Sequence, residues 1–230
     1  MGLRIKAKNY VFVLIAQLIL LLFAAFMQDF LILYLFFALA MLGIFGSVIA
    51  SIWESLIPRA LAIITGAIAF ISGFVWAVPN VSRPVVMISI AICAFAYAAF
   101  VLIAIISIGR SVFTAEHDTK NSIMGSLCIY MLIGMFFAFF YAGLDVMRPD
   151  AINFSGANVQ DLGDFSDYLY FSYTTLTTTG FGDIVPVRPV ARLLAYMETV
   201  IGSMYLVIVV ASLVSIHISQ LVRRQISKVG

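Results

Sequence analysis

Six apolar segments, each about as long as a membrane-crossing helix, constrain the fold of this chain more than any other feature. A helix crosses the hydrocarbon core of a bilayer with about 17–25 apolar residues. Only 10% of the residues are charged, whereas soluble domains have about 25%. We therefore predict an integral membrane protein of the all-α class, with six spans at Tyr10–Met27, Phe30–Ala50, Ala60–Val78, Val85–Ile108, Ile123–Gly143 and Leu193–Val222.

The first apolar segment has a second interpretation. Three cations, Arg4, Lys6 and Lys8, precede it, and Ala24 lies near a possible cleavage point, as in a signal peptide. Cleavage there leaves almost no loop before the next segment. We therefore expect the segment to be retained as a helix.

The connection between the last two spans contains the run TTLTTTGFGD at residues 174–183. An ordinary turn needs one or two glycines, not a row of threonines followed by Gly-Phe-Gly. Glycine adopts left-handed backbone conformations without steric cost, which explains Gly180 and Gly182 if the backbone alternates there. We expect Ser166–Leu176 to form a short half-helix before this run, because Asp164, Ser166 and Asp167 suit a helix N-terminus.

This run resembles the selectivity filter of tetrameric potassium channels, whose usual form is Thr-Val-Gly-Tyr-Gly-Asp. It is most similar to the two-pore-domain and prokaryotic members, which accept Phe at the tyrosine position. The resemblance implies rings of backbone carbonyls that replace the water around a potassium ion. The implied K⁺ ligands are the carbonyls of Thr178, Thr179, Gly180 and Phe181 and the Thr178 hydroxyl, with Gly182 completing the filter.

A single filter loop supplies one quarter of such a ring, so the resemblance implies a homotetramer with a re-entrant pore helix between the fifth and sixth spans. The alternative is a polar re-entrant or extracellular loop in a membrane protein of another kind. Residues expected to support the filter, by the same resemblance or by position, are Tyr170, Phe171, Thr174, Thr175, Thr177, Asp183 and Glu198.

Two positions depart from the usual filter. Thr179 stands where the family most often has Val or Ile, so its hydroxyl needs a partner, for which we expect a threonine of the pore helix. Phe181 lacks the hydroxyl that the family's tyrosine gives to a pore-helix Trp. Tyr170 and Phe171 are the matching pore-helix positions; if Phe171 is the match, donor and acceptor are lost together and aromatic packing supports the filter.

The last span holds two further candidates. Glu198 is an acid inside a span, which is costly and by default functional. Alignment with the family's inner helix puts Glu198 behind the filter, where we favour a bond to pore-helix hydroxyls or backbone over direct contact with the ion. Gly202 matches the glycine often treated as the gating hinge, and a packing glycine is the alternative.

The distribution of cations predicts the orientation. We expect a four-helix module (1–108), a cytoplasmic linker (109–122), the pore domain (123–222) and a short cytoplasmic tail (223–230). Nine Lys and Arg then lie on the side of both termini and four on the other, as the positive-inside rule requires. This places the protein in the plasma membrane with both termini cytoplasmic and the filter extracellular.

We therefore expect a passive, potassium-selective channel that is not steeply voltage-gated, because Val85–Ile108 contains no charged residue. A weakly selective cation channel is the nearer alternative, because of Thr179. A non-conducting scaffold or sensor is the alternative from another class. The sequence has no cluster typical of an enzyme or a bound metal and no sign of nucleic-acid binding. Apart from potassium ions in the filter it predicts no cofactor, and its expected partners are the other subunits of the homotetramer and the lipid bilayer; it does not identify a regulatory partner.

Overall fold

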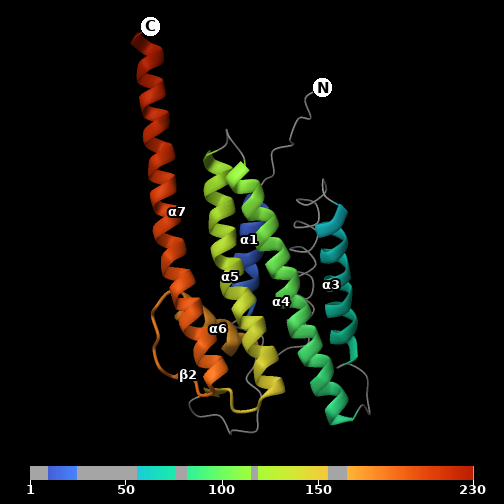
Figure 1. Ribbon diagram of the computed structural model, residues 1–230. Coiled ribbons are helices and arrows are strands. Elements are labelled where there is room, and N and C mark those ends of the chain that lie inside the picture. The colour runs from blue at the N-terminus through green and yellow to red at the C-terminus, as the bar shows by residue number, and fades with distance from the viewer. Residues whose placement is uncertain (1–9, 25–55, 76–81, 115–118, 155–164, 230) are drawn as a thin grey trace.

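The computed structural model describes residues 10–24, 56–75, 82–114, 119–154 and 165–229, and these residues form mainly helices (Figure 1). The second expected span, Phe30–Ala50, lies outside the described residues. The helices are α1 (Tyr10–Ala24), α3 (Leu56–Val75), α4 (Arg83–Thr114), α5 (Thr119–Met147), α6 (Phe165–Leu176) and α7 (Pro189–Val229), and the strands are β1 (Ile152–Phe154) and β2 (Ile184–Pro186).

Within the described ranges, three helices are long and apolar enough to cross a membrane: Arg83–Val112, Ser122–Met147 and Pro189–Val209. Two shorter apolar stretches lie at Tyr10–Leu22 and Pro58–Ser72, where the first and third spans are expected. These helices support an integral membrane protein. The arrangement with six spans stays a prediction.

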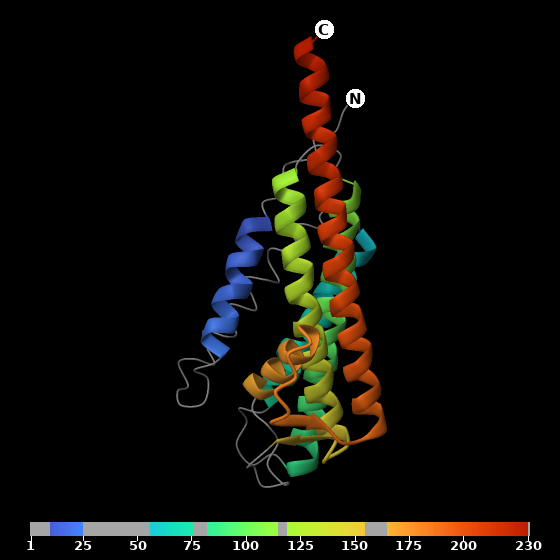
Figure 2. The same ribbon diagram turned by 90° about the vertical axis from the view of Figure 1, so that its left-hand side faces the viewer.

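The linker expected at 109–122 is largely helical. α4 continues to Thr114 and α5 already begins at Thr119. Polar residues such as Arg110 end an apolar segment but do not end a helix, and Gly109 is tolerated inside one at a cost of about 1 kcal/mol. α4 and α5 pack against each other and run in opposite directions (Figure 1). α3 lies beside α4, and α1 lies beside α5 (Figures 1 and 2).

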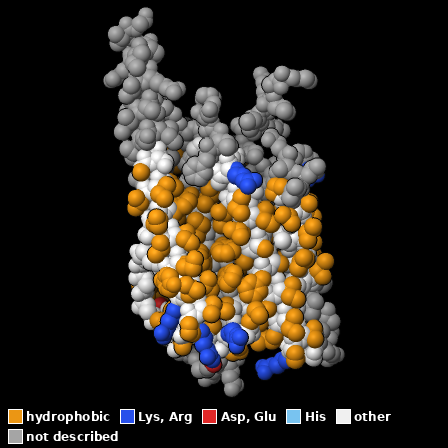
Figure 3. Space-filling model, viewed as in Figure 1, with side chains coloured by type: hydrophobic (Ala, Val, Ile, Leu, Met, Phe, Trp, Pro, Cys, Tyr) orange, Lys and Arg blue, Asp and Glu red, His pale blue; other side chains and the backbone are white. Residues whose placement is uncertain are grey.

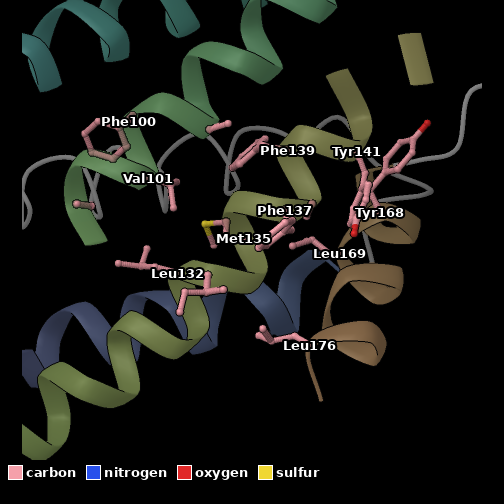
Figure 4. Packing of buried hydrophobic residues seen from close by; sticks show 14 of the residues in the cluster. Phe100, Val101, Leu132, Met135, Phe137, Phe139, Tyr141, Tyr168, Leu169 and Leu176 are labelled. Carbon is pink, nitrogen blue, oxygen red and sulfur yellow. The ribbon is translucent and has the colours of Figure 1, made fainter. Parts of the chain in front are cut away.

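The core lies around α5. Side chains from α4, α5 and α6 meet there, as the close view in Figure 4 shows for Phe100, Met135 and Leu169. Aromatic rings join the helices: Tyr97 stacks on Phe139 with ring centroids 5.0 Å apart. α6 packs against α5, so this core supports the helix before the segment expected to hold the filter.

A small antiparallel sheet, formed by β1 and β2, was not expected in an all-α protein. Ile152 pairs with Pro186 and Phe154 with Ile184. Each strand has only three residues, too short for a periodic pattern to be recognised. Asp145, at the end of α5, accepts a 2.7 Å hydrogen bond from the Tyr168 hydroxyl and a 3.4 Å bond from the Ile152 amide. The sheet thereby ties the segment after the expected filter to the end of α5.

The surface of the chain is apolar over a broad area. Figure 3 shows hydrophobic side chains over most of the visible face, with Lys and Arg near its two ends. α7 is the most exposed long helix, since only 11% of its apolar window is buried in the single chain. Its 41 residues correspond to about 60 Å, and it extends well beyond the other helices at the end opposite β2 (Figures 1 and 2).

Candidate functional site

α6 is too short to cross a membrane. Its 12 residues correspond to about 18 Å, against a hydrocarbon core of about 30 Å. It packs against α5 and α7 (Figure 2). Its bounds, Phe165–Leu176, differ by one residue from the half-helix expected at Ser166–Leu176.

α6 is fixed to α5 by close contact at Gly134. A Cβ atom added there would lie 2.6 Å from the Tyr173 ring, so only glycine allows this approach. The Tyr173 hydroxyl donates to the Met131 carbonyl at 2.7 Å. Ser172 Oγ lies 2.6 Å from the Gly134 carbonyl oxygen. A ring and two hydroxyl contacts thus set the position of α6 along α5.

α6 ends in a Schellman motif. The Thr178 amide donates to the Thr175 carbonyl at 3.0 Å, and the Thr179 amide to the Thr174 carbonyl at 2.8 Å. Thr178 occupies the left-handed position of this motif, with φ 59°. Glycine is usual there, and a non-glycine residue costs about 1–3 kcal/mol. The strained turn directs the chain from α6 into residues 178–182, the candidate filter.

The backbone of the candidate filter alternates in hand. φ is positive at Thr178, Gly180 (53°) and Gly182 (84°), and not at the residues between them. Alternation of this kind is what a filter needs, because it lets successive carbonyls face one axis. No heavy atom of a neighbouring element lies within 4 Å of a Cβ built on either glycine, and residues 177–183 are exposed in the single chain.

The Thr179 side chain has a hydroxyl partner. Its Oγ1 lies 2.9 Å from Thr177 Oγ1, and the Thr177 hydroxyl donates to the Tyr173 carbonyl at 2.7 Å. Because Thr177 has one proton, Thr179 donates in this pair. Thr177 directly follows α6, so the hydroxyl of Thr179 is satisfied by a threonine at the end of the helix.

Within the chain, Tyr170 rather than Phe171 lies beside Phe181. The rings of Tyr170 and Phe181 are nearly parallel, 6.2 Å apart with an interplanar angle of 4°. The Tyr170 hydroxyl donates to Asp183 Oδ2 at 2.7 Å. This bond holds the pKa of Asp183 below its ordinary value and raises the pKa of Tyr170. Phe171 is buried instead against the Tyr141 ring, 4.9 Å away.

The remaining threonines act through their backbone or their own helix. The Thr174 hydroxyl donates to the Phe171 carbonyl at 3.0 Å, and the Thr174 carbonyl accepts from the amides of Thr179 and Gly180 in the candidate filter. The Thr175 carbonyl lies 3.4 Å from the Thr199 hydroxyl of α7. The end of α6 is therefore held by α7 as well as by α5.

Glu198 lies behind α6 and is fully buried. Its Oε1 is 2.5 Å from Ser172 Oγ, and its Oε2 accepts from the Tyr141 hydroxyl at 2.8 Å. Ser172 is a hydroxyl of α6, the helix expected to be the pore helix, whereas Tyr141 was not expected as a partner. A buried tyrosine hydroxyl needs a partner, and an acid inside a span needs donors. These two requirements could have indicated from the sequence that Tyr141 and Glu198 are partners.

Gly202 lies where α7 crosses the end of α6. A Cβ atom there would collide with the Leu176 carbonyl oxygen. α7 is one continuous helix from Pro189 to Val229 through this position. The structure thus gives Gly202 a packing role, and its role as a gating hinge stays a prediction.

Residues 125–218 match a family model described as an ion channel. The matched residues are therefore similar to ion channels, and this similarity supports an ion-channel family of the potassium-channel type. It points to a channel rather than an enzyme, and the described residues contain no group of three or more His, Cys, Asp or Glu that could hold a metal. The ion-channel match covers most of α5, all of α6, the candidate filter and much of α7. No curated protein and no solved structure matches the chain.

Proposed function

We propose that this chain is one subunit of a homotetrameric, potassium-selective channel that conducts passively. The observation that carries the proposal is the alternating backbone of Thr178, Gly180 and Gly182, directly after a helix too short to span. A potassium ion gives up its water only where oxygens replace it. In this proposal α6 is the re-entrant pore helix, and residues 178–181 supply the carbonyl rings.

The exposure of the site supports the proposed fourfold assembly. Residues 177–183 are exposed in the single chain, and one loop cannot surround an ion. α7 also lacks a cover, with Met204 and Val207 more than half exposed. In the tetramer the four α7 helices surround the axis below the filter, while α5 lies outside them.

The environment of Thr179 favours potassium selectivity over weak cation selectivity. A hydroxyl behind the filter without a partner would leave a buried polar group unsatisfied or turn inward to the ion. The 2.9 Å contact with Thr177 avoids both. The Thr179 carbonyl is then free to serve the ion, as the carbonyl of Val does in the usual filter.

The proposed orientation follows the cation distribution. The filter faces the extracellular side of the plasma membrane, both termini are cytoplasmic, and six spans are complete with the segment between α1 and α3. α4 carries no charged residue between Arg83 and Arg110, so the four-helix module has no arginine-rich voltage sensor. Conduction therefore depends only weakly on voltage.

Potassium efflux from liposomes tests the proposal. Purified protein should release K⁺ from loaded vesicles, and mass measurement in nanodiscs should give four copies. Gly180→Ala should abolish efflux, because φ 53° is unfavourable for a residue with Cβ. Gly109→Ala is the matched control, because a Cβ there meets only Ile129 Cδ1 at 3.9 Å.

Equal efflux of K⁺ and Na⁺ would favour the weakly selective channel instead. Unaltered efflux in Gly180→Ala, or a conducting dimer, would contradict the assignment of the filter.

A further inference from the structure

The hydrogen bonds around Glu198 require one proton more than the neighbouring hydroxyls supply. Three short oxygen–oxygen contacts form a chain: Tyr141 to Glu198 at 2.8 Å, Glu198 to Ser172 at 2.5 Å, and Ser172 to the Gly134 carbonyl at 2.6 Å. Each contact needs one proton between its oxygens. Tyr141 and Ser172 contribute one each, and the Gly134 carbonyl contributes none. The third proton must belong to Glu198.

The surroundings of Glu198 agree with a neutral side chain. The residue is fully buried, and Tyr141 is buried with it. No hydrogen bond or ion pair from a Lys, Arg or His to Glu198 occurs among the described residues. Among the described residues, the titratable groups that interact with it are tyrosines: Tyr141 and Tyr130 on α5 and Tyr173 on α6. An ionised carboxylate in such a place is costly without a paired cation.

Asp145 provides a contrast in the same protein. It is also buried, and it accepts from the Tyr168 hydroxyl and the Ile152 amide. Each of those donors brings its own proton, so two contacts use two protons. The count at Asp145 is complete without a proton on the carboxylate. The deficit is therefore specific to Glu198 and does not follow from burial alone.

We propose that Glu198 is a neutral carboxylic acid that donates a hydrogen bond to Ser172, and that this bond makes it a positioning residue for α6. The Tyr141 hydroxyl donates to Oε2, Oε1–H donates to Ser172 Oγ, and Ser172 Oγ–H donates to the Gly134 carbonyl. α5, α6 and α7 are thereby joined by one unbroken chain of hydrogen bonds. Ser172 lies two residues before Thr174, whose carbonyl holds the filter amides.

Infrared spectroscopy of the full-length protein at neutral pH tests the protonation state without any measurement of conduction. The chain has three glutamates, Glu54, Glu116 and Glu198, so ¹³C labelling of the glutamate carboxyl groups separates their bands from those of aspartate. The wild type should show the C=O stretching band of a protonated carboxylic acid, and the label should shift it. Glu198→Gln should lose the band, whereas Asp145→Asn should keep it. Tyr141→Phe should keep the band but move it to higher frequency, because the C=O group loses its donor.

The absence of that band from the folded wild-type protein, or its persistence in Glu198→Gln, would overturn the proposal. This result is independent of transport. A protein that fails to conduct potassium but shows the band refutes the proposed function and leaves the protonation state of Glu198 established.

The positioning role, which rests on the proposed function, is tested by variants that differ in hydrogen-bonding capacity. Gln can accept from Tyr141 through Oε1 and donate to Ser172 through Nε2, so Glu198→Gln should retain the thermal stability and the K⁺ over Na⁺ preference of the wild type. Glu198→Leu has similar volume but no polar atoms, and it should lower both. If Gln behaves as Leu does, the hydrogen bonds of Glu198 do not position α6 and the positioning role is wrong.

Discussion

The Tyr170 hydroxyl donates a 2.7 Å hydrogen bond to Asp183 Oδ2, which links the face of α6 to the residue directly after the candidate filter. The Tyr170 ring also lies nearly parallel to the ring of Phe181, a residue of the candidate filter. One side chain thus contacts the outer end of the candidate filter by stacking and by a hydrogen bond. Phe181 has no hydroxyl of its own, and this bond gives the outer end a polar contact within the chain.

Tyr170→Phe should remove the hydrogen bond and keep the ring. The pKa of Asp183, which the bond lowers, should then rise toward its ordinary value of 3.8. Current through the channel should decay faster during sustained recording, because the outer filter is less well held. NMR titration of the Asp183 carboxyl and patch recording check the two effects. Tyr196→Phe, on the exposed surface of α7, should change neither.

The hydrogen bond between Tyr170 and Asp183 should persist over a wide pH range. Asp183 has a lowered pKa, so its contribution is present above 3.8 and is lost as the pH falls through the folded value below that. Tyr170 has a raised pKa, so its contribution is present below 10.0 and is lost as the pH rises through the folded value above that. Current decay should be constant between these limits and accelerate outside them. A transition near neutral pH that Tyr170→Phe abolishes would contradict this account.

Gly202→Ala should destabilise the protein by about 1–3 kcal/mol, the usual cost of overpacking. The added methyl group meets the Leu176 backbone carbonyl, which cannot move without shifting the start of the filter. Thermal unfolding in detergent measures the effect, with Gly109→Ala as the control. A hinge role predicts the opposite pattern, in which gating changes while stability is kept.

Thr178→Gly should separate stability from ion binding. Glycine relieves left-handed strain of about 1–3 kcal/mol and adds about 0.5–1 kcal/mol of unfolded-state entropy, so the variant should be as stable as the wild type or more so. It lacks the hydroxyl proposed as a K⁺ ligand, so calorimetry should show weaker potassium binding. Thr178→Ser keeps the hydroxyl and should bind potassium as the wild type does. Equal binding by the glycine variant would exclude the hydroxyl as a ligand.

Conductance should depend only weakly on voltage. Each elementary charge that crosses the membrane gains about 2.3 kcal/mol per 100 mV. α4 has no charged residue between Arg83 and Arg110. Recording over a wide voltage range measures this. Transient gating currents comparable to those of an arginine-rich sensor would show that the four-helix module has been misinterpreted.

The sequence predicted what depends on local chemistry. Glycines at alternate positions predicted where the backbone changes hand, and the expected bounds of the half-helix differ from those of α6 by one residue. The choice between Tyr170 and Phe171 depends on how α6 is rotated against α5, which the contact of Tyr173 with Gly134 sets. The residue pattern of the sequence does not determine how α6 is rotated against α5.

Other misses have the same cause. The partners of Glu198 lie 57 and 26 residues away in the chain, so only the packing of three helices brings them together. The strands β1 and β2 form because the ends of α5 and the filter loop meet. The start of α5 at Thr119 could not be predicted, because a polar segment on an otherwise apolar helix looks like a loop in the sequence.

The reversal potential under opposed potassium and sodium gradients tests the central claim most directly. With equal concentrations of K⁺ on one side of a planar bilayer and Na⁺ on the other, the reconstituted wild-type protein should reverse far from zero, in the direction set by potassium. Gly180→Ala should carry no such current. Reversal near zero would mean that the pore passes both ions equally, and the claim of a potassium-selective filter would be wrong.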